Sequence, residues 1–324
     1  GGKDINYYAS LGYTKTEGLY SGVGRERYNY SVKLDAQLMT DLKLMVDVLG
    51  NRTENKNTSY TTIDAAFSLD PTQVLQYTDG RLTSVNGGNP LIAARGLGGY
   101  NQNNSAMNTI SATLKYNASW LKGLSAYVKT TFDYNTFKTK IFSKPVTLYM
   151  PDKNNPDIIT EDPKTVYPTA NPQMEKAKQD VTNTLVEFGL NYANKFAGKH
   201  DVTGLLVTNY QRNSRDLLSA NNYRMGGFYP EIIGVVTGDD AKVSGTEETL
   251  QRASLIGRGT YSFDSRYFFE TSFRYDGSTR LHPDNRWKIF PSVSASWVMT
   301  NEDFFKYWKL IKCDIFYHRK KDIG

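Results

Sequence analysis

The residues best suited to chemistry in this 324-residue chain do not form a catalytic pattern. The three histidines, His200, His282 and His318, are scattered, and none has metal-ligand spacing from another histidine, a cysteine or a carboxylate cluster. An acidic group at 239–240 and 247–248 has the oxygen ligands that Ca²⁺ prefers, but it fits no EF-hand spacing, and a solvated acidic loop is the simpler interpretation. We therefore expect no cofactor, no metal site and no enzyme activity.

Composition narrows the class of protein further. Only 39% of the residues are hydrophobic, and no window supplies the roughly 18 continuous apolar residues of a membrane helix. A membrane-spanning strand remains compatible with this composition, because it presents only every second residue to lipid. The net charge of +6 is spread over the chain rather than gathered on one face, which argues against a nucleic-acid partner and fits a surface beside anionic lipid.

Strict alternation of apolar and polar residues recurs along nearly the whole chain and predicts β-strands. Most runs reach the roughly 9–11 residues of a tilted membrane strand, whereas strands of soluble proteins average about 5–6. About eleven strands are expected, at 5–13, 28–38, 42–49, 110–119, 124–134, 183–192, 202–210, 253–263, 267–275, 290–300 and 310–317.

The links between these strands alternate between short and long. Short links are expected at 39–41, 120–123, 196–200 and 264–266, and long ones at 50–105, 138–179 and 211–248, with smaller ones at 14–26 and 277–288. A membrane barrel shows the same alternation of short and long links, because its strands are joined by short turns on the periplasmic side and by long loops on the outer side. Six prolines in 138–179 are expected to prevent strand ladders there. The predicted fold class is all-β: an antiparallel up-and-down transmembrane β-barrel, incomplete, with about eleven strands of a larger barrel.

Aromatic residues fall near both ends of the expected strands, in two bands. Such bands match the interfacial girdles of a membrane barrel, although the β-propensity of aromatic residues is an alternative explanation. The periplasmic band includes Tyr7, Tyr8, Tyr116, Trp120, Tyr192, Phe196, Tyr261, Phe263 and Tyr267, and the outer band includes Tyr13, Tyr28, Tyr30, Phe132, Tyr134, Phe273 and Tyr275.

Further aromatic residues lie in the long links, where they are candidates for stacking on sugar rings or peptide side chains. The alternative role is packing of the loops against one another. These candidate substrate contacts are Tyr77, Tyr100, Tyr149, Tyr167, Tyr223, Phe228 and Tyr229.

The segment from Phe273 to Trp297 reads FRYDGSTRLHPDNRWKIFPSVSASW and contains an ordered motif. We expect Asp276-Gly277 to form a turn in which glycine supplies positive φ. Arg274 and Asp276 should face the barrel interior, where an ion pair to a plug or a neighbouring strand is a hypothesis. The motif residues are Arg274, Asp276, Gly277, Ser278, Arg280, Asn285, Arg286, Trp287, Phe290, Pro291, Ser292, Ser294 and Trp297.

This motif resembles a signature of SusC/RagA-like TonB-dependent transporters from the outer membranes of Bacteroidetes. The resemblance implies a 22-stranded barrel with an N-terminal plug, which imports glycans or peptides with a SusD-like lipoprotein and the TonB complex. Residues 1–324 would then be a partial barrel in outer-membrane lipid, without the plug domain and the C-terminal half of the barrel, and would not be active alone. A secreted, soluble all-β carbohydrate-binding module and an all-β enzyme are the alternatives.

Overall fold

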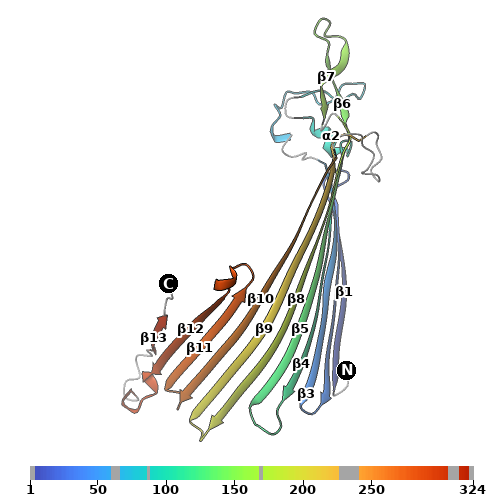
Figure 1. Cartoon of the computed structure of the whole chain (residues 1–324). Helices are drawn as coiled ribbons and strands as arrows, with labels where there is room; N and C mark the ends of the chain where they lie inside the picture. The colour runs from blue at the N-terminus through green and yellow to red at the C-terminus, as the bar shows by residue number, and fades with distance from the viewer. Residues whose placement is uncertain are drawn as a thin grey trace.

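The computed structural model describes residues 4–59, 66–85, 88–167, 171–225, 241–305 and 314–320, with side chains described except at 163–167 and 314–320. Eleven strands form one antiparallel sheet in which each strand pairs with its neighbours along the chain, β6 and β7 excepted (Figure 1). The strands are β1 (Ile5–Glu17), β2 (Gly24–Met39), β3 (Leu42–Thr58), β4 (Gly99–Asn117), β5 (Leu124–Ser143), β8 (Gln173–Phe196), β9 (His200–Asn222), β10 (Ala241–Phe263), β11 (Tyr267–Ser278), β12 (Trp287–Val298) and β13 (Asp314–Lys320).

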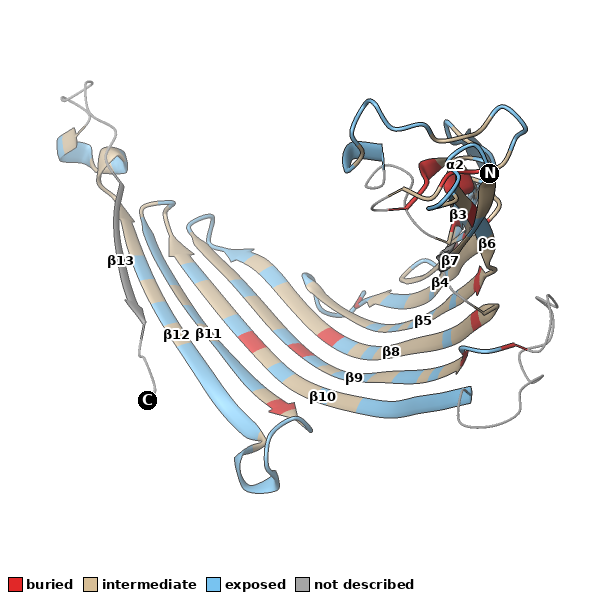
Figure 2. Ribbon diagram, turned by 90° about the horizontal axis from the view of Figure 1, so that it is seen from above, coloured by how far each residue is buried: buried red, intermediate tan, exposed pale blue. Residues whose placement is uncertain are grey.

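The sheet is an open, strongly curved wall. Figure 2 shows it as an arc, with no second sheet stacked on either face of the part that the structure describes. Large apolar side chains stay exposed across the sheet, including Leu11 at 83% and Tyr7 at 72%. A soluble sandwich would bury such residues between two sheets. The up-and-down, incomplete barrel predicted from the sequence is confirmed.

Register divides the strands into an apolar face and a polar face. Leu34 lies opposite Tyr7 and Val46, and Phe132 lies opposite Ile110, so these residues share the apolar face. The alternate positions, such as Asp133 and Asn183, share the polar face. Side chains point alternately to the two faces along every strand. The register between paired strands therefore determines on which face of the sheet each residue lies.

Several strands extend well beyond the lengths expected from alternation. β3 continues to Thr58, β8 begins at Gln173 and β10 begins at Ala241, so the long links at 50–105, 138–179 and 211–248 are shorter than predicted. The added portions are mostly polar, as in NRTENKNT at the end of β3. Alternation marks only the part of a strand that has one apolar face, and these extensions lie past that part.

Short turns close the opposite ends of the strands, as predicted. Ala197 and Gly198 connect β8 to β9 with φ of 47° and 71°, and Asp264 and Ser265 connect β10 to β11 with φ of 52° and 54°. Two successive residues with positive φ match the right-handed twist of the flanking strands. The turn after β12 is longer and contains two 3₁₀ helices, η2 (Met299–Asn301) and η3 (Asp303–Phe305).

Two long links fold together into what we call the loop module, residues 74–85, 88–98 and 144–167. It contains the helix α2 (Pro90–Ala94) and a two-stranded sheet of β6 (Val146–Pro151) and β7 (Ile159–Tyr167), and lies at one end of the main sheet (Figure 1). Its core is formed by Leu82, Ile92 and Leu148, which are 6%, 0% and 0% exposed. The sequence showed neither this core nor its helix.

The expectation that prolines exclude strand ladders from this link is wrong. Pro151 is the last residue of β6, and the register of β6 with β7 shifts between Thr147 and Tyr149, opposite the segment of β7 that contains Pro163. Proline is tolerated at strand ends and bulges because no ladder hydrogen bond is needed from it there.

Asn89 is expected to hold the loop module together. Its side chain is fully buried, accepts from the backbone N–H of Leu91, and donates to the carbonyls of Leu75 at 2.7 Å and Thr83 at 3.0 Å. Asn89→Ala leaves these groups unpaired, so we expect a local loss of about 1–3 kcal/mol. Hydrogen exchange of residues 75–98 should accelerate in the full-length protein.

The control for this prediction is Asn154→Ala, at an exposed position in the link between β6 and β7. It should leave hydrogen exchange of the loop module unchanged, and neither substitution should alter the main sheet. Equal acceleration in both variants would contradict the anchoring role of Asn89.

Candidate functional site

The polar face carries a continuous hydrogen-bonded row across four strands. Thr109 of β4 donates to Asp133 of β5 at 2.6 Å, Asn183 of β8 donates to the same carboxylate at 2.9 Å, and Gln211 of β9 donates to Asn183 at 2.8 Å. Each side chain is satisfied by its neighbour on the next strand. The row makes this face of the sheet rich in hydrogen-bond donors and acceptors, in contrast to the apolar face.

The motif at 274–297 forms a structural connection, not a reactive site. Arg274 Nε pairs with Asp276 Oδ2 at 3.2 Å on its own strand, and Ser278 Oγ accepts from the backbone N–H of Arg280 at 3.3 Å. Arg286 Nε donates to the carbonyl of Leu281 at 3.3 Å, close to the 3₁₀ helix η1 (Pro283–Asn285) that contains Asn285. These bonds order the link between β11 and β12. The ion pair to a plug or to another strand remains a prediction.

Gly277 does not occupy the turn expected for it. It lies inside β11, opposite Trp287 of β12, and is not among the residues with positive φ. A Cβ at this position would approach the Trp287 ring to 2.7 Å, and the same ring stacks on Tyr275 at 4.9 Å. Glycine is therefore required here because the indole covers the backbone, not because of a turn conformation.

The other motif residues continue along β12. Phe290 and Pro291 pair with Arg274 and Phe273, and Ser292 pairs with Ser272. Phe290 is 55% exposed and, opposite Arg274, lies on the polar face of the sheet. The motif therefore specifies the pairing of two strands and the loop between them.

Trp297 belongs to a cluster at the turn after β12. Glu302 accepts from Tyr267 Oη at 2.7 Å and from Trp297 Nε1 at 3.1 Å, and pairs with Arg266 Nη1 at 3.0 Å. The Tyr267 and Trp297 rings stack at 6.4 Å. Trp297 belongs to the motif visible in the sequence, but no pattern in the sequence marks Glu302, whose carboxylate joins the turn between β10 and β11 to the turn after β12.

Glu302→Gln should weaken this cluster in a pH-dependent way. Hydrogen bonds from Tyr267 and Trp297, and then the charge of Arg266, hold the pKa of the Glu302 carboxyl below its usual value. A lowered pKa stabilises the folded state above the unfolded value of about 4.3, and this stabilisation is lost as the pH falls through the folded pKa. Thermal melts of the full-length protein should therefore show a lower Tm for the variant at pH 7 and a smaller difference near pH 3.

The control is Glu248→Gln, at an exposed position of β10. Its Tm should match that of the parent at both pH values. If the difference in Tm between the parent and Glu302→Gln were as large near pH 3 as at pH 7, packing and not the charge of the carboxylate would account for the effect.

The candidate substrate contacts are separated by the fold. Tyr77 and Tyr149 lie in the loop module, where the guanidinium of Arg81 is 5.2 Å from the Tyr149 ring. Tyr223 lies at the outer end of β9, is 43% exposed, and has Lys242 Nζ 5.7 Å from its ring. Tyr149 is half-buried and Tyr223 is exposed, and the contact of either residue with substrate stays a prediction.

Of the four remaining candidate substrate contacts, one packs against other side chains, and the side chains of the other three are not described. Tyr100 contacts Phe142 at 5.8 Å, in a cluster with Met174 and Met225, which is the packing role left open above. The Tyr167 side chain is not described, and Phe228 and Tyr229 lie outside the described residues.

Most aromatic residues of the expected bands lie on the apolar face, but Tyr8 lies opposite Lys33 on the polar face and Trp120 lies in the turn between β4 and β5. Tyr13 and Tyr28 contact each other at 4.9 Å across β1 and β2, and Phe263 stacks on Tyr267 at 6.4 Å at the opposite end of the strands. The rings thus gather at both ends of the apolar stretch. This arrangement is what interfacial girdles require.

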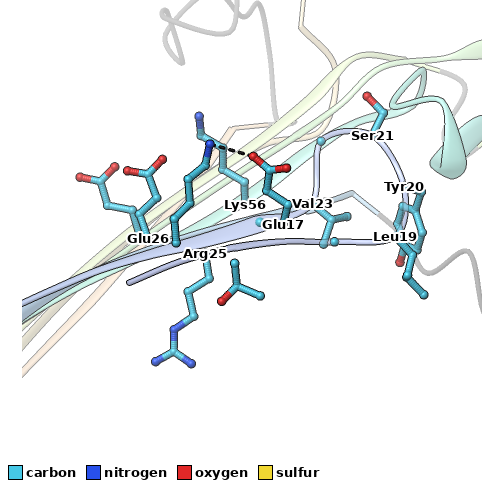
Figure 3. Close-up of a pocket in the computed structure, with 14 residues that line it drawn as sticks. Glu17, Leu19, Tyr20, Ser21, Val23, Arg25, Glu26 and Lys56 are labelled. Carbon is cyan, nitrogen blue, oxygen red and sulfur yellow. Dashed lines mark ion pairs between the residues drawn. The ribbon is translucent and has the colours of Figure 1, made fainter. Parts of the chain in front are cut away.

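A groove of about 520 Å³ lies at the hairpin between β1 and β2, and its main feature is a mixed set of charges (Figure 3). Lys15 Nζ pairs with Glu17 Oε1 at 2.8 Å, beside Glu26 and Lys56. No nucleophile with an adjacent base lines it. Among the residues that the structure describes, no group of three or more His, Cys, Asp or Glu side chains is placed to hold a metal, and no helix is long and apolar enough to cross a membrane.

Comparison with known proteins identifies relatives over almost the whole chain, although no protein-family model matches it. TonB-dependent receptors P26 and P39 of Formosa agariphila are 23% and 26% identical, each over 94% of this chain and over 30% and 28% of their own length. TonB-dependent receptor SusC of Bacteroides thetaiotaomicron is 44% identical over 61 residues, 19% of this chain and 6% of that protein. This chain therefore spans less than a third of the relatives it matches.

Solved structures agree with the fold. The RagAB peptide transporter gives a TM-score of 0.71 at 18% identity, covering 94% of this chain and 34% of that chain. The RagAB peptide importer in its closed-closed state gives 0.72 at the same identity. At this identity the likeness concerns the arrangement of the strands.

Proposed function

We propose that the chain is a β-barrel segment of a SusC/RagA-like TonB-dependent transporter of the outer membrane, and that it forms part of the wall of an importer for oligosaccharides or peptides. The observation that carries this proposal is the curved single sheet with one apolar and one polar face, joined to sequence similarity over 94% of the chain. The apolar face meets lipid, and the polar face lines the path of the solute.

The substrate class rests on two kinds of support. The hydrogen-bonded row from Thr109 to Gln211 offers donors and acceptors to a polar solute on the inner wall. Tyr149 and Tyr223 offer aromatic faces in the loop region, and such faces stack on sugar rings and on peptide side chains alike. RagAB, which shares the fold, is a peptide transporter.

We further propose that residues 1–324 act only within a larger protein, which supplies a plug domain and the remaining strands. β1 and β13 are the edges of the open sheet. Unpaired edge amides in hydrocarbon cost several kcal/mol each, so an isolated segment would not insert stably. A SusD-like lipoprotein and the TonB complex would act through the full-length parent, and transport would proceed without enzymatic conversion of the solute.

The test is uptake by cells that produce the full-length parent. We expect accumulation of labelled oligosaccharides or peptides from a defined panel, abolished by an uncoupler of the proton gradient. Tyr149→Ala with Tyr223→Ala should reduce uptake, while the matched Tyr20→Ala, in the β1–β2 loop, should not. Uptake that survives the uncoupler would contradict a TonB-dependent importer.

The competing interpretation, a soluble carbohydrate-binding module, is tested on the isolated chain. A module would fold cooperatively in buffer without lipid or detergent, and would bury its apolar face. We expect instead no cooperative unfolding transition in buffer and no protease-resistant form.

A further inference from the structure

The outer end of β10 extends past the end of β11, and one edge of the strand has no neighbour there (Figure 2). β10 pairs with β9 from Ala241 to Phe263 without a register shift, whereas its pairing with β11 begins only at Arg252. Because β11 is the neighbour of β10 on this side and ends at Ser278, strands added at β1 or β13 would leave this edge open. We call Ala241–Leu250 the free edge.

The free edge presents backbone groups at every second residue. Gln251 shows which residues are concerned, because its carbonyl accepts from the backbone N–H of Thr279 at 3.0 Å on the β11 side. Alternate residues of an antiparallel strand direct both of their backbone groups to the same side. Five residues therefore direct N–H and C=O away from β9, and no residue that the structure describes pairs with these groups: Ala241, Val243, Gly245, Glu247 and Thr249.

The sequence of the free edge does not block the addition of a strand. Proteins usually protect an unpaired edge with proline, a β-bulge or lysines. The segment AKVSGTEETL contains no proline and a single lysine, Lys242, and its pairing with β9 has no bulge. Residues 241–249 are all exposed, Val243 at 73%. At about 3.3 Å per residue, the free edge offers about 33 Å of regular strand to a ligand.

A regular row of N–H and C=O groups selects an extended polypeptide as the ligand. A peptide backbone repeats a donor and an acceptor at the spacing of a β-ladder, whereas an oligosaccharide carries hydroxyl groups without that repeat. A stable protein interface takes about 20–30 residues from each partner. The free edge, residues 241–250, is much shorter than that. It therefore suits a ligand that binds weakly and is released, as a transported peptide must be.

Gly245, near the middle of the free edge, favours an aromatic side chain on the added strand. On its paired side it lies opposite Leu218 of β9, which is 57% exposed. Gly257 and Gly277 of the same sheet each lie opposite an aromatic residue whose ring covers the glycine. An aromatic residue opposite Gly245 would cover it in the same way, and its ring would extend toward Leu218.

Glu247 favours a basic side chain on the added strand. It lies directly opposite Asp216 of β9, which lies directly opposite Asp180 of β8. Lys178 Nζ pairs with Asp180 at 2.6 Å and also attracts Asp216, but it stands two strands away from Glu247. Because like charges directly opposite each other destabilise a sheet, a basic side chain on the open side of Glu247 would be stabilising.

We propose that the free edge binds extended peptide solutes as an added antiparallel strand. In that direction, the residue opposite Glu247 comes two positions before the residue opposite Gly245, and the residue opposite Val243 follows two positions later. The preferred sequence is therefore a basic, an aromatic and an apolar residue, with one residue of any type between each pair. This inference rests on the proposed importer function and narrows its solute to peptides.

The test measures binding of a fluorescent peptide, Thr-Ser-Lys-Ser-Tyr-Ser-Val, to the full-length transporter in nanodiscs. N-methylation of its tyrosine removes one ladder hydrogen bond and places a methyl group against the free edge, so binding should weaken at least about fivefold. The same modification of the serine before the tyrosine should leave binding unchanged, because the N–H of that serine points away from β10.

Variants of the protein test the side-chain preference. Glu247→Gln should weaken binding of this peptide about two- to fivefold, whereas Glu248→Gln, on the other face of the same strand, should not. Glu247→Lys should bind a peptide with glutamate in place of its lysine more tightly than the parent does. Val243→Pro removes an outward N–H without breaking a bond to β9, so it should lower binding while heat-modifiable migration in gels stays unchanged.

The proposal is overturned if the two N-methylated peptides bind alike, or if Glu248→Gln weakens binding as much as Glu247→Gln. It is also overturned if the parent binds peptide only after residues 226–240 are replaced by a Gly/Ser linker, because the chain would then cover its own edge. A parent dimer that Val243→Pro dissociates would assign the edge to a second copy and overturn it as well.

Uptake by cells separates this inference from the proposed function. If the peptide does not bind but uptake remains sensitive to the uncoupler, the free edge is not a peptide site and the importer stands. If the peptide binds as described but uptake survives the uncoupler, the importer function fails and the binding of peptides to the free edge stands.

Discussion

Leu34→Arg is expected to destabilise the full-length barrel by about 2–4 kcal/mol when it folds into bilayers. Leu34 lies on the apolar face of β2, opposite Tyr7 and Val46, and between Tyr30 of the outer aromatic band and Met39, the last residue of the strand. An arginine there places its charge near the middle of the hydrocarbon, where it cannot reach water without distorting the bilayer. Equilibrium unfolding of parent and variant in lipid vesicles measures the difference.

Ser31→Arg is the matched control on the same strand. Ser31 lies on the polar face, opposite Ser10 and Leu49, so its arginine enters the aqueous interior. We expect a change within about 0.5 kcal/mol. If Ser31→Arg were the costlier of the two substitutions, the assignment of the two faces would be reversed, and with it the proposed location of the solute path.

Alternation was sufficient to predict the sheet because register follows from it. Once Leu34 and Phe132 are assigned to one face, the pairing of β2 with β3 and of β4 with β5 follows from short turns. The eleven-stranded order is therefore visible in the sequence. Prediction from alternation has a physical limit. The apolar face is required only where a strand crosses hydrocarbon, so the alternation ends where the strand leaves the hydrocarbon.

The loop module and the Glu302 cluster were not predictable in this way. Ile92 and Leu148 come from two links separated by β4 and β5, and no periodicity connects them. Glu302 contacts Arg266 and Tyr267 from the preceding hairpin. Such contacts depend on which loops the barrel brings together, which only the assembled sheet determines.

The sequence predicts the motif of the candidate site but not the role of every residue in it. The residues from Arg274 to Trp297 form an ordered motif in the sequence. Asp-Gly is a common turn pair, so the sequence predicts a turn at Gly277. A glycine inside an alternating strand is equally a signal of close approach by another group. Gly277 lies opposite Trp287, and that signal was available from the pairing of the two strands.

Four glycines of the sheet share this arrangement, each directly opposite an aromatic residue whose ring covers it. A Cβ would approach the ring to between 2.1 and 2.7 Å in each case. Such contacts stabilise a strand that glycine alone would weaken, and they fix the register. The pairs are Gly50 with Tyr30, Gly189 with Tyr127, Gly257 with Phe273, and Gly277 with Trp287.

Gly257→Val should therefore destabilise the full-length barrel by about 1–3 kcal/mol, although valine favours strands. The new Cβ would lie 2.2 Å from Cε1 of Phe273, so the ring must leave its position over β10. Gly259→Val is the control, two residues along the same face of the same strand, where the nearest atom to a Cβ is Thr271 Cγ2 at 3.8 Å. Because valine fits there and glycine is a poor strand residue, that substitution should be neutral or stabilising.

Phe273→Leu in the Gly257→Val background distinguishes a steric conflict from a general intolerance of the site. Removing the ring should recover part of the lost stability, so the two substitutions should be less costly together than the sum of their separate effects. Strict additivity in equilibrium unfolding would show that the ring does not rest on Gly257. The requirement for glycine at position 257 would then have a cause other than the aromatic ring on the neighbouring strand.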